Sequence, residues 1–297
     1  MRKDNIIGAH QYWAAAFIDI LGQREAMREI YFVPNKENSQ QMEKFNAEIK
    51  KVYGAVKLIH NLFQNYFKST ESVRTPSIQL NEEQMKIWHT LHSPPLKQQR
   101  FSDGFLFYLS LADSVERSPV VGIYDFIVAC GSVLLSSFVN KTPIRGGIDI
   151  GTGMEINPND LYGPVITKIY ELESKTAQYP RIIVGDELIN YLRSLERSEE
   201  KGEKSEFERK VARICLNLIM DDIDGFPAID FLGDGIYQFF CPDSYQLFPM
   251  AHQFVVEQSE ESKKKRNTTL SFRYSQLLNY FEAKKDRWVN EIPKRCP

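Results

Sequence analysis

The segment PVVGIYDFIVACGSVLLSSFV, residues 119–139, constrains the fold more than any other part of the sequence. It matches the roughly 20 residues that an apolar helix needs to cross a bilayer. It also contains Asp125, two glycines and three serines, and a strand-like segment follows almost at once. A carboxylate is costly in a membrane-spanning helix. We therefore expect a helix buried at the centre of a soluble protein, with the other elements packed around it.

The composition fits such a protein. The 37 basic and 39 acidic residues give a net charge of -2, so no overall field favours nucleic acid or a membrane surface as a partner. The four cysteines form no CxxC pair, which argues against a zinc site or a disulfide framework. The N-terminus lacks the apolar core of a signal peptide. We expect a cytoplasmic location.

Strands and helices alternate along the rest of the chain. Strands are predicted at residues 14–21, on both sides of an Asp-Gly hairpin turn at 102–104, and at 143–153, 180–185, 226–233 and 235–241. Helices are predicted at residues 42–66, 82–92, 163–177 and 185–197, with two more over 245–290 that the sequence KKKR separates. The glycines of PIRGGIDIGTG predict close approach of a backbone or a ligand. The pattern predicts an α/β sandwich around a mixed sheet.

Two further segments predict core packing and solvent exposure, respectively. The apolar stripe of residues 42–66 predicts core packing, with a dimer seam as the alternative. The charged run ERSEEKGEKSEFERK, residues 196–210, predicts a solvated surface segment.

Asp19 is a single carboxylate within the apolar run AAAFIDILGQ, residues 14–23, and Asp103 lies at the tip of the predicted hairpin. Carboxylates at neighbouring strand ends are hard oxygen ligands, which suit a pair of magnesium or manganese ions. Each residue also has a structural interpretation. Asp19 could be a paired core carboxylate, and Asp103 could serve only to form the turn.

The order of motifs resembles the catalytic domain of class III nucleotidyl cyclases over about residues 12–190. The motifs are FIDILG, FSDGF opening a hairpin, the apolar helix, IRGGIDIGTG and DLYGPVITKIYELE. Within this superfamily, the sequence is most similar to the pyrimidine cyclases of bacterial Pycsar anti-phage systems. The segments that carry this similarity are GGIDIG, ELESKTAQYPRIIV, DIDGFPAIDFLG and YSQLLNYF. The resemblance implies one enlarged domain with a ferredoxin-like, palm-type mixed sheet. A helical insertion would occupy about residues 27–97 and a C-terminal extension about residues 200–297.

The resemblance also implies a function. Two Mn²⁺ or Mg²⁺ ions would be held by Asp19, Asp103 and the backbone carbonyl of Ile20. They would promote conversion of a pyrimidine nucleoside triphosphate to its 3′,5′-cyclic monophosphate, with release of pyrophosphate. Cyclic UMP is favoured over cyclic CMP. The enzyme would be a homodimer with shared sites, and its product would act on a separate effector in anti-phage defence.

Other site residues follow from the same resemblance. The backbone around Gly22, in the turn ILGQRE, would hold phosphates. Gln99 and Asp160 occupy the positions that read the base in adenylyl cyclases. An amide can donate or accept a hydrogen bond, and an ionised carboxylate accepts one. Unlike the residues of adenylyl cyclases, these two side chains therefore do not restrict the base to a purine.

The sequence departs from the family on the helix after Gly163. Where adenylyl and guanylyl cyclases have an asparagine and a transition-state arginine, this chain has Thr167 and Glu171. Thr167 could still orient ribose, but Glu171 cannot replace a cation. The candidates for that cation, in order of preference, are Arg181, Lys168 and Arg145. Arg181 also has a plain structural interpretation. The alternatives to a pyrimidine cyclase are a purine cyclase and a catalytically inactive, nucleotide-sensing module.

Overall fold

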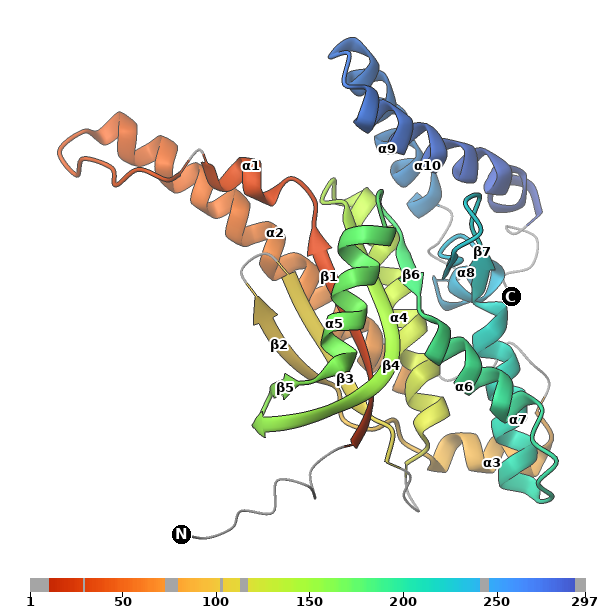
Figure 1. Cartoon of the computed structure of the whole chain (residues 1–297). Coiled ribbons are helices and arrows are strands. Elements are labelled where there is room, and N and C mark those ends of the chain that lie inside the picture. The colour runs from red at the N-terminus through yellow and green to blue at the C-terminus, as the bar shows by residue number, and fades with distance from the viewer. Residues whose placement is uncertain are drawn as a thin grey trace, which may run out of the picture.

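Strand β1 lies near the middle of a mixed sheet that runs through the molecule (Figure 1). The computed structural model describes residues 11–28, 30–72, 80–101, 104–112, 117–240 and 246–291. The strands are β1 (Gln11–Ile20), β2 (Lys97–Phe101), β3 (Gly104–Ser110), β4 (Ile144–Asn157), β5 (Asp160–Tyr162), β6 (Ile182–Val184), β7 (Ile219–Asp221) and β8 (Pro227–Ile229). The α-helices are α1 (Gln23–Arg28), α2 (Ser39–Ser72), α3 (Glu82–Thr90), α4 (Pro119–Val139), α5 (Pro164–Glu171), α6 (Asp186–Glu196), α7 (Glu203–Asn217), α8 (Asp234–Phe240), α9 (Leu247–Lys264) and α10 (Thr268–Asp286). Two π-helical turns, Leu172–Thr176 and Arg287–Glu291, extend α5 and α10.

The strands are ordered β2-β3-β1-β4-β6-β8-β7, and β5 pairs with the far end of β4. β1 is antiparallel to both β3 and β4, whereas β4 and β6 are parallel. The predicted mixed α/β architecture is confirmed. β8 and β7, which lie after residue 200 in the chain, continue the same sheet beyond β6.

The two faces of β1 contact different clusters, because successive side chains of a strand point to opposite faces. One face joins the large core beneath α2 and α4, through Ala14, Ala16, Ile18 and Ile20. The other face packs against α5, through Trp13, Ala15 and the half-buried Phe17. Asp19 therefore lies on the α5 face. Figure 1 shows α5 in front of β1 and β4 and α4 behind them.

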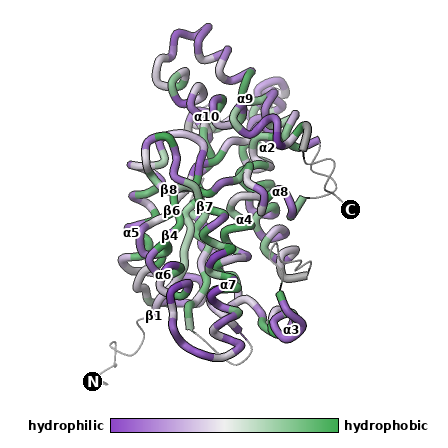
Figure 2. The backbone as a smooth tube through the Cα atoms, turned by 90° about the vertical axis from the view of Figure 1, so that its right-hand side faces the viewer, coloured by the Kyte–Doolittle hydropathy of each residue, from purple (hydrophilic) through white to green (hydrophobic). Residues whose placement is uncertain are grey.

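Helix α4 is the centre of the large core. It is long and apolar enough to cross a membrane, but nearly all of it is buried inside the fold. Figure 2 shows hydrophobic segments concentrated in the strands and α4, with hydrophilic segments at the outer turns. The prediction of a buried core helix is confirmed, whereas the cytoplasmic location stays a prediction.

The stripe on α2 is buried over its second half. Val56, Ile59 and Phe63 pack in the large core, and the Phe63 ring stacks on Phe107 of β3 at 3.8 Å between centroids. Core packing is thus confirmed for this part of the stripe. The first half of α2 is only partly buried.

Glycines of β4 let α5 approach the sheet closely. A Cβ atom on Gly147 would lie 2.5 Å from the Leu172 Cβ and 2.6 Å from the Ile169 carbonyl oxygen. A Cβ on Gly151 would lie 3.0 Å from the Val165 Cβ. The predicted close approach is therefore made by the backbone and side chains of α5 and the π-helical turn that follows it.

Two sequence-based predictions differ from the structure. The segment at residues 235–241 is predicted as a strand, but α8 occupies Asp234–Phe240, so this prediction is wrong there. Ile236 and Tyr237 pack into the large core, and a short apolar run does not distinguish a strand from a buried helix. The charged run at residues 196–210 is largely exposed, as predicted, but it is more than a surface segment. Helix α7 begins at Glu203, and Phe207 is fully buried.

We expect Gly147→Ala to lower the free energy of unfolding by about 1 to 3 kcal/mol, because the new methyl group would overlap backbone that cannot move freely. Gly54→Ala is the control. Gly54 lies in the interior of α2, and a Cβ atom added there would have no atom within 4 Å, so alanine should stabilise the helix by roughly 0.5 to 1 kcal/mol. Urea unfolding of both variants tests the contact, and equal stabilities would contradict it.

Candidate functional site

A cavity of about 770 Å³ opens at the C-terminal end of β1. Its wall combines residues from the first strand, the turn after it, α5 with its π-helical extension, and α10. The lining residues are Phe17, Asp19, Ile20, Leu21, Gly22, Glu25, Phe101, Arg145, Tyr170, Glu173, Ser174 and Arg273. Four of the candidate residues from the sequence, Asp19, Ile20, Gly22 and Arg145, thus line one cavity.

Asp19 is positioned by the pairing of β1 on both sides. Its backbone pairs with Gly104 of β3 and Arg145 of β4, so these three residues form one row across the sheet. Arg145 Nη2 lies 3.7 Å from Asp19 Oδ2, and Arg145 Nε donates to Glu173 Oε1 at 2.5 Å. Glu173 is buried, whereas the Asp19 side chain keeps 22% of its surface exposed. Arg145 is therefore held mainly by Glu173, and the Asp19 carboxylate faces the cavity.

The geometry at Asp19 suits a metal ligand. Its contact with Arg145 is longer than the roughly 2.7–2.9 Å of a close charge-assisted hydrogen bond, and its side chain lines the cavity. Carboxylate oxygens are the ligands that Mg²⁺ and Mn²⁺ prefer. Asp103, the second predicted ligand, lies outside the described residues, although its neighbour Gly104 pairs with Asp19. Within the described ranges, no three His, Cys, Asp or Glu residues are grouped as a complete metal site.

The turn after β1 begins helix α1. Gly22 has φ of +84°, a conformation that favours glycine, and α1 starts at the next residue. The predicted turn from strand to helix is therefore present. Helix α1 has only six residues, and the role of Gly22 in holding phosphates stays a prediction.

Gln99 and Asp160, the predicted base-reading pair, lie in contact. Gln99 Nε2 donates to Asp160 Oδ1 at 3.2 Å, and Asn157 Nδ2 donates to Asp160 Oδ2 at 3.4 Å. Gln99 Oε1 is buried and has no hydrogen-bond partner in the described part of the chain. Neither residue of the pair lines the Asp19 cavity. Their role in reading the base stays a prediction, and within one chain the structure separates both residues from the Asp19 cavity.

A second polar cluster lies beside this pair. Glu155 accepts hydrogen bonds from Lys97 and from Tyr108. Burial and then the hydrogen bond to Glu155 raise the pKa of Tyr108 above its ordinary value. Partial burial tends to raise the pKa of Glu155, but the hydrogen bonds from Lys97 and Tyr108 outweigh it and lower that pKa. Glu155 is therefore an ionised acceptor, and Tyr108 is its neutral donor.

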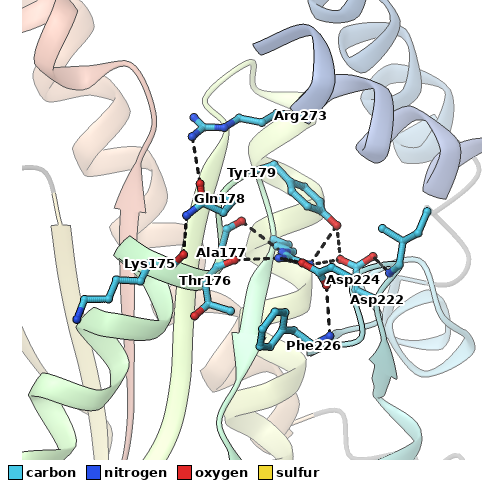
Figure 3. A network of polar contacts seen from close by, with 11 residues as sticks. Lys175, Thr176, Ala177, Gln178, Tyr179, Asp222, Asp224, Phe226 and Arg273 are labelled. Atoms are coloured by element: carbon cyan, nitrogen blue, oxygen red, sulfur yellow. Dashed lines mark hydrogen bonds and ion pairs between the residues drawn. The ribbon is translucent and has the colours of Figure 1, made fainter. Parts of the chain in front are cut away.

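Arg181 is enclosed in a network of its own (Figure 3). Its guanidinium donates to Asp222 at 2.7 Å and to Asp224 at 2.6 and 2.9 Å, and also to the carbonyls of Thr176 and Ala177. The ring of Tyr179 lies 4.3 Å from its Cζ. Burial alone would lower the pKa of Arg181, but the hydrogen bonds to Asp224 and Asp222 raise it. The side chain is buried and fastens the turn between β7 and β8 to the core.

This network bears on the choice among the cation candidates, which stays a prediction. Arg181 is the first choice from the sequence, but its donors are occupied and it does not line the Asp19 cavity. In this structure its structural interpretation holds, because two carboxylates from distant sequence converge on it. Arg145, the third choice, is the candidate that lies beside Asp19.

Lys168 and Thr167 also lie away from the cavity. Lys168 is 3.7 Å from Asp149 and 3.5 Å from Glu187, and it lines a neighbouring cavity of about 420 Å³. Thr167 is exposed on the outer side of α5. Glu171 is exposed and forms an ion pair with Lys175. Within a single chain, the structure does not bring these residues to Asp19.

Asp149, within the GGIDIG motif, has a structural role. Its Oδ1 accepts from the Leu188 amide in the first turn of α6, where the N-cap position is Gly185 and supplies no side chain. A Cβ on Gly185 would lie 2.2 Å from the Asp149 carboxyl carbon. Asp149 therefore caps a helix from a neighbouring strand. Burial raises its pKa, although the Ile150 and Leu188 amides and the Lys168 charge oppose this.

Arg273 is a cavity residue that the sequence patterns did not reveal. It lies on α10, in the C-terminal extension, and its Nη2 donates to Gln178 Oε1 at 3.4 Å. Burial and then the charge of Arg145 lower its pKa. The signal that could have found it is its position directly before YSQLLNYF, one of the segments that carry the family resemblance.

No protein-family model matches this sequence, and it has no match among curated proteins.

The Arg181 network predicts a pH-dependent contribution to stability. The hydrogen bond from Arg181 lowers the pKa of Asp224. The resulting stabilisation is present above the unfolded pKa, about 3.9, and is lost as pH falls through the lower folded pKa. We expect Arg181→Leu to lower the free energy of unfolding at pH 7 by about 3 kcal/mol, since it removes the cation beside the largely buried Asp222, whereas the partly exposed Asp224 adds less. This difference should shrink as the pH falls below about 3.9, through the lowered pKa of Asp224.

The control is Arg213→Leu, which removes an exposed arginine with one ion pair to Glu196 and should cost less than about 1 kcal/mol. Urea unfolding at several pH values measures both variants. A loss in Arg181→Leu that stays constant with pH would contradict the role of Asp224.

Proposed function

We propose that the protein is a class III-like nucleotidyl cyclase that converts a pyrimidine nucleoside triphosphate to its 3′,5′-cyclic monophosphate. The observation that carries this proposal is the placement of Asp19. Its carboxylate lies at the end of a central strand, faces a cavity of about 770 Å³, and has Arg145 beside it. A cavity of this size is within the range of small-molecule sites.

The order of the first four strands supports the proposal. Along the chain, β1, α2, β2, β3, α4 and β4 follow one another, and in the sheet these strands are ordered β2-β3-β1-β4. A strand-helix-strand-strand-helix-strand unit of this kind is ferredoxin-like. It is the core that the resemblance to class III cyclases implies. Fold alone does not establish an activity, so the proposal depends on Asp19 and its surroundings.

Four residues that line the cavity, and Asp103, have proposed roles. Asp19, the Ile20 carbonyl and Asp103 would hold two Mn²⁺ or Mg²⁺ ions, which when bound would supply charge neutralisation to the triphosphate and acidify the ribose 3′-hydroxyl. Arg145 would bind phosphate oxygens, and Glu173 would keep its guanidinium in place. In the reaction, the 3′-hydroxyl loses its proton and its oxygen bonds to the α-phosphorus. The bond to the β-phosphate then breaks and pyrophosphate leaves.

The pair of Gln99 and Asp160 would read the base. Because Asp160 holds the amide of Gln99, the buried Gln99 Oε1 is an acceptor, which suits the N3–H of uracil or the amine of cytosine. A homodimer would bring this pair from one protomer to the Asp19 cavity of the other. The separation of the two groups within one chain supports this arrangement. The product would act on a separate effector in anti-phage defence.

A catalytically inactive, nucleotide-sensing module is the second candidate. The observation that favours it is Glu171, which occupies the position of the family's transition-state arginine and is paired with Lys175. Such a module would bind the nucleotide and release no pyrophosphate. The two candidates therefore differ in the formation of product.

We expect Asp19→Asn to lower kcat by more than about 100-fold while the fold stays intact, because the amide keeps the shape of the side chain but loses the charge that binds metal. The protein is incubated with each of the four nucleoside triphosphates and manganese, and the cyclic products are identified by mass spectrometry. Asp286→Asn, at the exposed end of α10, is the control and should retain activity. A cyclic purine as the main product at equal substrate concentrations would contradict the pyrimidine assignment. Absence of any product in the wild type, with nucleotide still bound, would favour the sensing module.

We expect Asp160→Asn to change the ratio of activities on UTP and CTP by roughly tenfold or more. The amide can donate where the carboxylate only accepts, and mismatched hydrogen bonds in a desolvated pocket cost about 1 to 3 kcal/mol. Competition between UTP and CTP, with kcat/KM for each, measures the change. An unchanged ratio would remove Asp160 from base reading.

A further inference from the structure

We infer that Arg273 of the C-terminal helix α10 binds the polyphosphate group of the nucleotide, together with Arg145 of β4. This inference rests on the proposed function, because it concerns the same cavity. It assigns to the C-terminal extension a direct part in ligand binding.

The two arginines approach one cavity from different parts of the chain. Arg145 is the second residue of β4, and Arg273 lies in the first half of α10, yet both line the cavity that Asp19 faces. Guanidinium groups bind phosphate oxygens in a bidentate manner, and two of them can hold different phosphates of one chain. The cavity, at about 770 Å³, is large enough for a triphosphate.

Arg273 differs from Arg181 and Arg145 in its partners. Arg181 has two carboxylates, and Arg145 has Glu173. Across the described ranges, no carboxylate lies within 4.0 Å of the Arg273 guanidinium, and its hydrogen bond goes to the neutral amide of Gln178. Partial burial of a cation beside another cation is unfavourable unless an anion compensates. A phosphate group is an anion that this cavity can admit.

The turn that contacts Arg273 is itself fixed. Gln178 has φ of +37°, and its Nε2 donates to the Lys175 carbonyl at 2.5 Å. Arg181 binds the neighbouring Thr176 and Ala177 carbonyls, as Figure 3 shows. Arg181 is therefore a positioning residue. It holds the turn that presents Gln178 to Arg273, and so it acts on the cavity without facing it.

The charge of the cavity makes this binding metal-dependent. Its described lining contains three carboxylates and two guanidinium groups, which gives a net charge of -1: Asp19, Glu25, Glu173, Arg145 and Arg273. One divalent cation at Asp19 changes this charge to +1. We therefore expect a polyphosphate to bind weakly without a divalent cation and tightly with one, through both arginines and the ion.

Inorganic tripolyphosphate is the probe, because it has no base and cannot be cyclised. Its dissociation constant for the full-length protein is measured by calorimetry, with and without Mg²⁺. In Mg²⁺, we expect Arg273→Gln to weaken binding by about tenfold or more, as the loss of one charge-assisted contact implies. Arg273→Lys should recover part of the loss. Lys285→Gln removes the same charge from α10 at a residue paired with Glu282, and it should leave binding unchanged.

The outcomes separate this inference from the proposed function. Tripolyphosphate binding that depends on Arg273, in a protein that forms no cyclic product, would support the inference and contradict the cyclase proposal. Formation of cyclic product with unchanged tripolyphosphate affinity in Arg273→Gln would overturn the inference and leave the cyclase proposal standing. Equal losses in Arg273→Gln and Lys285→Gln would also overturn it, because they would indicate net charge in place of a contact. Circular dichroism of each variant confirms that the fold is retained.

Discussion

Strand β1 pairs with β3 on one side and with β4 on the other, and the geometry of the site follows from this double pairing. The two neighbours fix the register of the strand, and with it the face on which every side chain lies. A slip of one residue would turn Asp19 into the large core and Ile18 towards the cavity. The burial of Ile18 and Ile20 beneath α2 and α4 therefore holds the Asp19 carboxylate in place.

Three arginines show how partners decide the role of a side chain. Arg181 is saturated by Asp222 and Asp224, so it contributes to stability and positions a turn. Arg145 is held by Glu173 but still lies beside Asp19. Arg273 has no carboxylate partner among the described residues and shares the cavity with Arg145. The guanidinium group of Arg181 thus stabilises a turn, whereas in our proposals those of Arg145 and Arg273 bind an anion.

Local patterns predicted the fold well where burial follows a simple period. The stripe on α2, the apolar length of α4 and the glycines of β4 correspond to features that the structure contains. The family resemblance singled out Gln99 and Asp160, and only the structure shows that they are hydrogen-bonded to each other. The structure of the segment at residues 235–241 could not be predicted from its apolar pattern, because a short apolar run is compatible with both a strand and a buried helix. Arg273 was missed because the cavity joins it to Asp19 and Arg145, which lie far from it in the chain.

The mixed α/β class, the core helix α4 and the position of Asp19 at the end of an apolar strand could all be read from the order of the residues. These features depend on residues close together in the chain, whose periodicity fixes which side is buried. Tertiary contacts alone settle which arginine lies beside Asp19 and which one is bound elsewhere. That choice depends on carboxylates and helices from distant segments, since the energy of a charge is set by the groups around it in space and not by its neighbours in sequence.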